Sequence, residues 1–451
     1  MISNPKRQMA PSWLESWACR LVTGFLDRYI TTGCLILEEE GGKSYTFQGT
    51  TTKCPLRVIL KVHSPQFYWK VMTRADMGLA DAYIDGDISF KDEHEGLLSL
   101  IMLLIANRDA NKSITEVKKR RSWWTPMLFT AGIASSKLFF QHVLRKNSLT
   151  QARRNISRHY DLSNEVFAMF LGETMTYSAA LFKDEDEDLN KAQMRKHSIL
   201  IDKARIDSEH DILEIGCGWG TFAIEVVKQK GCKYTGITLS KEQLKFAEMK
   251  VKEAGLQDRI KFLLCDYREL HSHESKKYDR IISWQVFEMI EHVGHEYMEG
   301  FFGSCESLLA EDGLLVLQFT SLPDERYDEN RHSSDFIKEY IFPGCCVPSL
   351  SMVTSAMVAA SRLCVEHVEN IGSHYYPTLR CWRKYFLENQ SKIVAKGFDE
   401  KFIRTWEYYF DYCAAGFKTY TLGNYQVVFS RPGNIEALGN PYKGFPSAFS
   451  Q

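Results

Sequence analysis

An acidic side chain and three closely spaced glycines stand together in the stretch Asp211-Ile-Leu-Glu-Ile-Gly-Cys-Gly-Trp-Gly220. The stretch begins with a short apolar run, which is typical of a buried parallel strand. It then passes through Gly216, Gly218 and Gly220, whose alternate spacing allows a sharp turn and a close approach of a ligand to the main chain. Glu214 ends the predicted strand, at the edge where open α/β sheets bind ligands. These residues therefore predict a binding site at the end of a strand.

The chemistry of this turn indicates a nucleoside that carries a small charged group and no phosphate. The glycine spacing differs from the G-x-G-x-x-G of dinucleotide-binding turns. S-adenosylmethionine (SAM) fits, because its amine and ribose hydroxyls need an acceptor and its carboxylate can accept hydrogen bonds from backbone N–H groups. We expect SAM to contact Glu214, Gly216, Cys217, Gly218 and Gly220.

Two later loops extend the predicted SAM site, because they follow the second and third strands of the same sheet. The first loop places Thr238, Leu239, Ser240 and Gln243 where the ribose hydroxyls would lie. Many SAM-binding sheets carry an acid there, whereas this chain has hydroxyl and amide groups. The order and spacing of the loops, taken together, support SAM more strongly than any one loop does.

The second loop, Cys265-Asp-Tyr-Arg268, is expected to bracket the adenine. Tyr267 would stack on the base and Asp266 would accept a hydrogen bond from its exocyclic amine, with Arg268 beside them. Both residues also have a purely structural interpretation, in which Asp266 caps a helix and Tyr267 packs in the core.

The elements that position these loops alternate regularly from Asp211 onward. They predict a doubly wound parallel sheet of the Rossmann-like class I methyltransferase type, with helical insertions that cover the substrate. The predicted strands are 211–215, 233–238, 260–264, 278–283 and 313–320, and the predicted helices are 221–230, 241–254 and 296–309. Beyond them we expect a helical stretch at 333–362, an apolar strand near 363–371, helices at 378–394 and 399–415, and a final strand, 425–430, at the sheet edge.

The N-terminal part of the chain predicts a smaller α+β domain over residues 1–105. An amphipathic helix at 11–30 precedes a hairpin at 34–47, a strand at 57–62 and a further helix. The first helix either packs on its own domain or lies in a membrane interface. The remaining domains are predicted as a basic helical linker at 106–150, a SAM-dependent methyltransferase domain at 151–435 and a C-terminal tail at 436–451.

A basic segment stands out in a chain whose net charge is only −1. Between Asn107 and Arg158 there are twelve Lys and Arg residues against two acids, and Lys118-Lys-Arg-Arg-Ser-Trp-Trp124 adds aromatic rings to four cations. Such a segment suits an anionic membrane surface or a nucleic-acid backbone, or it is a solvated linker. No nucleic-acid-binding motif accompanies it, so we expect no nucleic-acid partner.

Several classes of protein are disfavoured by composition. The twelve cysteines include no C-x-x-C pair, which argues against zinc knuckles and for free thiols in a reducing compartment. His271, His273, His292 and His295 lack a coherent metal-binding pattern, so we expect no metal. No run reaches the ~18 apolar residues of a membrane span, and charges within the N-terminal helix argue against a secretory signal.

A series of short motifs continues the pattern along the chain. They are Arg158-His-Tyr-Asp161, Tyr177-Ser178, Glu214-Ile-Gly-Cys-Gly-Trp-Gly220, Thr238-Leu-Ser240, Asp266-Tyr-Arg268, Glu291-His-Val-Gly294, Tyr340-Ile-Phe-Pro343, Gly372-Ser-His-Tyr-Tyr-Pro-Thr-Leu379, Tyr408-Tyr-Phe-Asp-Tyr-Cys413 and Gln426-Val-Val-Phe-Ser-Arg431. With these motifs, residues 151–432 resemble the cyclopropane-fatty-acyl-phospholipid synthases and mycolic acid cyclopropane synthases, most closely the plant-type members.

The resemblance implies that a methylene group passes from SAM to the cis double bond of an acyl chain in membrane phospholipid, which gains a cyclopropane ring. Tyrosine rings would stabilise the carbocation by cation–π attraction, and a bound bicarbonate would remove the proton. Tyr177 and Ser178 would contact SAM, while Tyr375 and a glutamate would hold the bicarbonate. Ala179 replaces the family's cysteine and offers only backbone; Gln318 replaces a histidine, and its amide can still bind an anion.

The glutamate of the implied bicarbonate site is either Glu288 or Glu291, because the chain before Glu291 is longer than the family pattern. The longer local motif favours Glu291, and a spacing of three places the two on one helical face or one turn apart. Cys413 matches a family cysteine near the active site. The chemistry needs no thiolate, so a role in positioning or packing is favoured for it.

Three functions are therefore compared. The first is the cyclopropane synthase just described, which would act in the cytoplasm at a membrane surface. A homodimer is one assembly open to it. The second is a SAM-dependent N-methyltransferase of small amines, a class built on similar sequences. The third is a catalytically weakened lipid-binding homologue, which the departures at Ala179 and before Glu291 keep open.

Overall fold

The structure is a computed structural model that describes residues 12–110, 164–270, 276–284, 291, 293–440 and 442–449. The chain divides into two compact units, of which the first comprises Met1–Phe140 with Phe398–Ala415 and the second comprises Gln141–Gly397 with Gly416–Gln451. The segment 398–415, which the sequence analysis assigned to the methyltransferase domain, thus belongs to the first unit. Most of the basic segment, including Lys118–Arg121, lies outside the described residues.

The first unit contains a four-stranded sheet with the strand order β2-β1-β3-β4. Strand β1 pairs antiparallel with β2, as the predicted hairpin requires, and parallel with β3, while β4 is antiparallel to β3. The elements are α1 (Trp13–Tyr29), β1 (Cys34–Glu39), β2 (Ser44–Gln48), β3 (Arg57–Val62), α2 (Gln66–Ile84), β4 (Ile88–Phe90) and α3 (Gly96–Ala110). A capping box formed by Ser12 and Glu15 begins α1.

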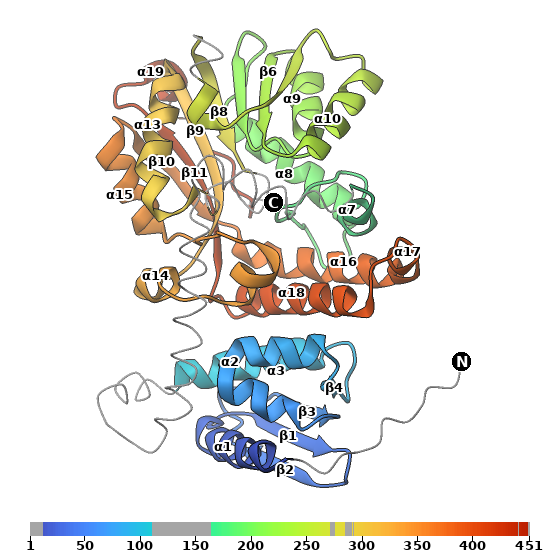
Figure 1. The fold of residues 1–451 in the computed structure, drawn as a ribbon. Helices are drawn as coiled ribbons and strands as arrows, with labels where there is room; N and C mark the ends of the chain where they lie inside the picture. Colours follow the sequence, from blue (N-terminus) through green and yellow to red (C-terminus); the bar gives the residue numbers. More distant parts are fainter. Residues whose placement is uncertain are drawn as a thin grey trace. The chain divides into compact units, whose positions relative to one another are not determined.

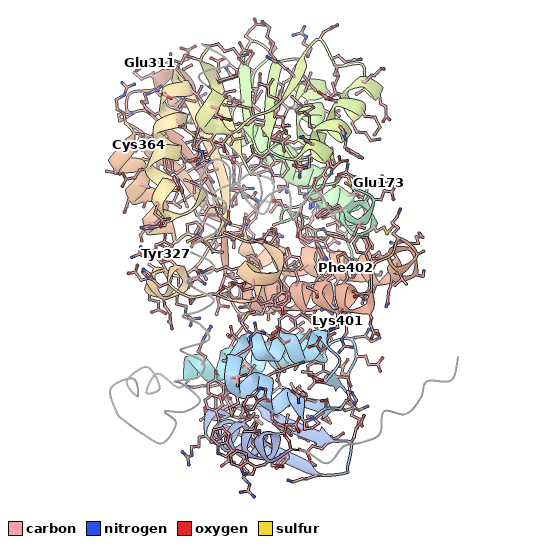
Figure 2. The ribbon with its side chains drawn as sticks, viewed as in Figure 1. Glu173, Glu311, Tyr327, Cys364, Lys401 and Phe402 are labelled. Atoms are coloured by element: carbon pink, nitrogen blue, oxygen red, sulfur yellow. The ribbon has the colours of Figure 1, made fainter. Side chains whose placement is uncertain are left out.

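Helix α18 (Glu400–Lys418) joins this unit although it lies nearly 300 residues further along the chain. Its Arg404 donates from Nε to the Tyr83 carbonyl at 2.6 Å, and its Tyr408 ring lies 5.9 Å from the Tyr83 ring. Lys401, labelled in Figure 2, pairs with Asp85 at 2.6 Å. The aromatic and ionic contacts with the end of α2 explain why this helix groups with the first unit.

The second unit is built on a seven-stranded sheet with the order β10-β11-β9-β8-β5-β6-β7. The strands are β5 (Asp211–Ile215), β6 (Lys233–Thr238), β7 (Ile260–Leu264), β8 (Tyr278–Ser283), β9 (Leu309–Ser321), β10 (Cys364–Asn370) and β11 (Gly423–Ser430). Strands β5 to β9 are mutually parallel, whereas β11 is antiparallel to both β9 and β10. This mixed α/β sheet has the strand order of the class I methyltransferase fold.

The expected place of the last strand is wrong, because β11 lies inside the sheet and β10 forms its edge. Strand β10 is not apolar either. It carries Glu366, His367 and Glu369, and its side chains are exposed or half-buried. Charged side chains on an edge strand discourage pairing with other chains, whereas Val427, Val428 and Phe429 of β11 are buried on both faces, as an interior strand requires.

Helices cover both faces of this sheet (Figure 1). On one face, α8 (Leu189–Lys203), α9 (Thr221–Lys230) and α10 (Lys241–Glu253) pack on an apolar cluster that includes Phe222 and Val226. On the other face, α13 (Met298–Leu308) and α15 (Leu350–Ala360) pack on a cluster that includes Phe301 and Phe302. The remaining described helical elements of this unit are α7 (Asn164–Leu171), α14 (Asp324–Arg331), α16 (Tyr375–Glu388), α17 (Gln390–Ala395), α19 (Ile435–Leu438) and the short turns η1 (Tyr267–Glu269), η2 (His295–Tyr297), η3 (Ile337–Ile341) and η4 (Gly372–His374).

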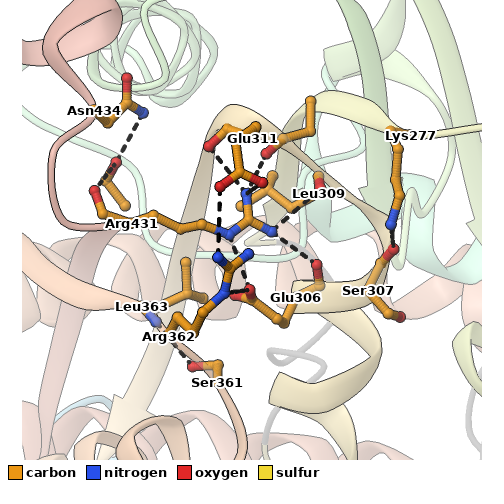
Figure 3. A network of polar contacts seen from close by, with 12 residues as sticks. Lys277, Glu306, Ser307, Leu309, Glu311, Ser361, Arg362, Leu363, Arg431 and Asn434 are labelled. Atoms are coloured by element: carbon orange, nitrogen blue, oxygen red, sulfur yellow. Dashed lines mark hydrogen bonds and ion pairs between the residues drawn. The ribbon is translucent and has the colours of Figure 1, made fainter.

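A buried arginine, Arg431, forms hydrogen bonds with residues around the amino-terminal end of β9 (Figure 3). The Arg431 guanidinium donates to Glu306 Oε1 at 2.9 Å, to the Glu306 and Glu311 carbonyls at 3.0 Å each, and to the Leu309 carbonyl at 3.3 Å. Arg362 pairs with the same Glu306 carboxylate at 3.0 Å from a more exposed position. This cluster lies at the opposite edge of the parallel strands from the glycine turn, so it supports the fold away from the binding edge.

Candidate active site

The glycine turn between β5 and α9 is fixed by hydrogen bonds between backbone groups. The N–H groups of Gly216 and Cys217 both donate to the Ile237 carbonyl, at 2.9 and 3.0 Å, and the Gly220 N–H donates to the Cys217 carbonyl at 3.0 Å. Gly220 has φ +81°, and a Cβ there would lie 2.8 Å from the Ala247 Cβ, so only glycine fits. Within the described residues no hydrogen bond holds the Gly218 N–H, which leaves it to a ligand.

Glu214 is buried beneath this turn, and both of its oxygens have protein partners. Oε1 accepts from Trp284 Nε1 at 2.8 Å and Oε2 accepts from the Tyr234 hydroxyl at 2.9 Å. Burial raises the pKa of Glu214 to about 8, against the hydrogen bonds from Tyr234 and Trp284, which lower it. In this arrangement the carboxyl ties β5 to β6 and to the end of β8, and its expected contact with SAM stays a prediction.

The loop after β6 is organised by its own polar side chains. Thr238 Oγ1 donates to Gln243 Oε1 at 2.8 Å, and Ser240 caps α10 by accepting from the Gln243 N–H. The opposite atom of that amide, Gln243 Nε2, is buried and has no hydrogen-bond partner within the described part of the chain. A buried donor of this kind costs free energy unless a ligand accepts from it. The expected contact of this loop with the ribose hydroxyls stays a prediction, and Leu239 is half-buried.

In the loop after β7, the structural interpretations of Asp266 and Tyr267 are both realised. Asp266 caps η1, and its two oxygens accept from Arg268 Nε at 2.8 Å and Nη2 at 2.7 Å. The Tyr267 ring meets Phe301 edge-on at 5.3 Å in the core, with the Arg268 guanidinium 5.4 Å from its centroid. The predicted contacts of these three residues with adenine stay predictions.

A cluster of aromatic rings surrounds Tyr177, which follows α7. The Tyr177 ring lies 5.6 Å from Phe167, 6.0 Å from Phe170, 5.2 Å from Trp382 and 6.3 Å from Phe342. All five rings are buried. The elements that supply them are far apart in sequence, so the cluster depends on the tertiary fold.

Tyr375 extends the aromatic cluster from the start of α16. Its ring stacks on Phe417 at 4.3 Å and meets Trp382 edge-on at 6.2 Å. One turn later, Thr378 Oγ1 accepts from the Ala180 N–H at 3.0 Å, which fixes the loop that carries Tyr177 and Ser178 to this helix. Such a set of π faces in a dry environment can attract a carbocation.

A polar patch lies beside the aromatic cluster at the carboxyl end of β9. Gln318 Nε2 donates to Ser178 Oγ at 2.7 Å, so the residue that replaces the family's histidine contacts a predicted SAM ligand. Two residues later, the Thr320 N–H donates to Glu291 Oε1 at 2.6 Å. Glu291 is thus buried next to the strand that carries Gln318. The small Ala179 is buried in the same region.

The roles of two other predicted site residues stay predictions. Glu288 lies outside the described residues, so its competition with Glu291 rests on the sequence alone. Cys413 is buried on α18, in the stretch that belongs to the first unit. Among the described residues, no group of three or more His, Cys, Asp or Glu side chains could hold a metal ion.

Sequence reasoning missed the polar side chains that support the site from α8. Gln193 Nε2 donates to the Ser178 carbonyl at 2.9 Å, and Lys203 Nζ donates to Gln426 Oε1 at 2.7 Å. Both α8 residues are fully buried. Their spacing of ten residues gives no sign of a shared role, and polar residues on a helix ordinarily predict a solvated surface.

Comparisons with known proteins agree with the geometry. Residues 147–427 match the family described as mycolic acid cyclopropane synthetase. The chain is 33% identical over 409 residues to the tuberculostearic acid methyltransferase of Mycobacterium tuberculosis, covering 85% of this chain and 90% of that protein. It is 29% identical over 374 residues to the cyclopropane-fatty-acyl-phospholipid synthase of Escherichia coli, covering 82% and 87% of the two chains. A solved mycolic acid cyclopropane synthase, complexed with SAH and CTAB, is 28% identical with a TM-score of 0.56, covering 62% of this chain and 98% of its own.

Proposed function

The chain belongs to the mycolic acid cyclopropane synthetase family and is a SAM-dependent methyltransferase, and we propose that it converts the cis double bond of an acyl chain in membrane phospholipid into a cyclopropane ring. The observation that carries this proposal is the buried aromatic cluster around Tyr177 beside the polar patch of Gln318 and Glu291. A dry aromatic cage suits an apolar acyl chain and a cationic reaction centre, whereas a small amine would favour exposed carboxylates.

SAM supplies an electrophilic methyl group to the double bond. The residues of this chain then have two tasks. The π faces of Tyr177, Trp382 and Tyr375 stabilise positive charge on the acyl chain by cation–π attraction, which is strongest where water is excluded. The buried packing of these rings also keeps water from capturing the cation.

Closure of the ring requires a base that takes one proton from the added methyl group. We propose that bicarbonate serves, held by the Tyr375 hydroxyl as donor and by Glu291 as acceptor of its O–H. The Thr320 N–H donates to one carboxylate oxygen of Glu291. This hydrogen bond fixes the carboxylate and therefore also the direction of its second oxygen. Gln318 has a different part, because its amide already bonds Gln426 and Ser178.

We also propose that the enzyme works as a peripheral protein at a membrane surface. Helix α1 buries Ala18, Val22 and Leu26 against its own domain, yet Trp13 is 78% exposed and Trp17 is 40% exposed. Exposed tryptophans at one end of a helix suit the headgroup region of a bilayer. No helix in the described part of the chain has the length and apolarity to span a membrane.

One assay tests the reaction. The protein is incubated with methyl-labelled SAM and vesicles of a cis-monounsaturated phospholipid, and the fatty acids are then released and analysed. We expect label in a cyclopropane ring, loss of that product in Glu291→Gln, and normal product in the matched surface control Glu311→Gln. Label in a methyl or methylene branch would correct the reaction type and keep the substrate class. Label transferred to small amines and not to lipid would refute the proposal in favour of an N-methyltransferase, and SAM binding with no transfer would favour a lipid-binding role.

A further inference from the structure

A line of hydrogen bonds runs through the interior of the second unit to Ser178. Lys203 Nζ on α8 donates to Gln426 Oε1 on β11 at 2.7 Å, and Gln426 Nε2 donates to Gln318 Oε1 on β9 at 2.8 Å. Gln318 Nε2 in turn donates to Ser178 Oγ at 2.7 Å. All four residues are at most 1% exposed. A buried cation is therefore connected to a predicted SAM ligand by two amide side chains.

Lys203 fixes the direction of every bond in this line. An ammonium group has donors and no acceptor, so Gln426 must turn its oxygen toward Lys203 and its NH₂ toward Gln318. Gln318 must then turn its oxygen toward Gln426 and its NH₂ toward Ser178. Amide orientations are ordinarily ambiguous, but here a single cation determines both. Ser178 Oγ is thus an acceptor in this bond, and its hydroxyl hydrogen is directed to another group.

The cation at the start of the line is itself held in place by an ion pair. Lys203 Nζ lies 2.5 Å from Glu369 Oε2 on β10, and Glu369 Oε1 accepts from the Ser447 hydroxyl at 2.5 Å and from the Ala448 N–H at 3.0 Å. Burial alone would raise the pKa of Glu369, but the bonds from Lys203 and Ser447 lower it below its ordinary value. Glu369 therefore stays ionised. Burial lowers the pKa of Lys203, whereas the adjacent Glu369 carboxylate opposes that shift and favours the ammonium form.

We propose that this line makes Ser178 a hydrogen-bond donor to a carboxylate-type anion in the active site, with Lys203, Gln426 and Gln318 as positioning residues. The inference rests on the proposed placement of Ser178 in the SAM site. Two groups in the reaction have this chemistry, the carboxylate of SAM and bicarbonate. The ammonium of SAM is unsuited to this contact, because two donors would face each other.

The substitution Gln426→Glu tests the proposal by reversing the direction of the hydrogen bond between Gln318 and Ser178. A carboxylate at position 426 accepts from Lys203 and from the Gln318 NH₂, so Gln318 turns its oxygen toward Ser178. The Ser178 hydroxyl then donates back to Gln318 and presents only lone pairs to the site. The change keeps the size of the side chain and strengthens its contact with Lys203. Gln229→Glu, the same chemical change on the exposed face of α9, is the matched control.

The readout is binding, measured by calorimetry without lipid. S-adenosylhomocysteine carries the carboxylate, and 5′-methylthioadenosine is the same nucleoside without the amino-acid part. If the carboxylate is the acceptor, Gln426→Glu weakens S-adenosylhomocysteine binding about 10- to 100-fold, the range for a hydrogen bond to a charged group, and leaves 5′-methylthioadenosine unchanged. Ser178→Ala should cause a similar loss, and the double variant should lose little more than either single one.

If bicarbonate is the acceptor, the same factor appears in the affinity of the S-adenosylhomocysteine-bound protein for bicarbonate. The proposal is overturned if neither affinity changes, or if both nucleosides lose affinity together, as a general disturbance of the fold would cause. A melting curve for each variant checks that fold directly. Because none of these measurements uses lipid, a wild-type protein that binds S-adenosylhomocysteine but modifies no phospholipid would refute the proposed function and leave this inference to its own test.

Discussion

The substitution Glu214→Gln should change how the stability of the protein depends on pH. Glu214 is buried between Trp284 Nε1 and the Tyr234 hydroxyl, and burial raises its pKa to about 8. A glutamine reproduces the protonated form, since its oxygen can accept from Trp284 and its NH₂ can donate to Tyr234. The variant therefore removes one titration and keeps the local hydrogen bonds.

The sign follows from the protons bound in each state. Between pH 5 and pH 8 the folded protein keeps the proton on Glu214, whereas the unfolded chain, with a pKa near 4.5, has lost it. Stability contributed by the protonated carboxyl is thus present at low pH and is lost as the pH rises toward 8. Over that range the difference amounts to roughly 4 kcal/mol as an order of magnitude. Neighbouring His197 and Cys217 stay uncharged, because burial lowers the pKa of the first and raises that of the second.

The assay is thermal unfolding of both proteins from pH 5 to pH 8.5. We expect similar melting temperatures near pH 5 and a growing advantage for Glu214→Gln, reaching about 5–10 °C near pH 8. Subtracting one curve from the other removes the titration of every group that the two proteins share. Parallel curves over the whole range would show that Glu214 is ionised throughout, and the reasoning from burial would be refuted.

Three further outcomes follow from the packing. Gly220→Ala should weaken S-adenosylhomocysteine binding and cost about 1–3 kcal/mol of stability, whereas Gly231→Ala, at a similar φ with open space for a Cβ, should leave binding unchanged. Arg431→Met should cost about 3–5 kcal/mol in chemical denaturation, because it removes the buried cation beside Glu306 and the donor to the Glu306, Leu309 and Glu311 carbonyls. Arg362→Met, at a site 65% exposed, should cost under about 1 kcal/mol. Trp13→Ser should reduce sedimentation with anionic vesicles without lowering the melting temperature; unchanged sedimentation would exclude α1 as the membrane contact.

The binding edge of the sheet was predictable because local and tertiary signals agree there. Strands β5 to β8 have the predicted bounds, since each run is limited by turn residues and the runs of β5 and β8 are buried on both faces. The backbone conformation of the turn requires its glycines, and any chain of this fold shares that requirement. Residues at the site were harder to assign. The carboxyl oxygens of Glu214 bond Trp284 and Tyr234, which lie elsewhere in the sequence, while those of Asp266 bond Arg268 within the same loop.

The far side of the sheet was less predictable for a physical reason. Runs of β-branched and aromatic residues indicate strands near 364–370 and 423–430, but strand propensity carries no information on which of them is the edge. The buried side chains of Lys203 and Gln426 were missed because polar residues are ordinarily exposed, and only their pairing across elements makes burial tolerable. The short motifs of the family identified Gln318 but could not show that its amide is already engaged.

Helix α18 has a consequence for dividing the protein. The chain leaves the first unit near residue 140, returns to it at 398 and leaves again at 415, so the two units are joined by three covalent connections. A fragment cut at a single linker, such as 151–435, would carry α18 without the Tyr83 and Asp85 partners of its Arg404 and Lys401. In this chain, removing the N-terminal unit would therefore leave part of α18 without the residues it contacts.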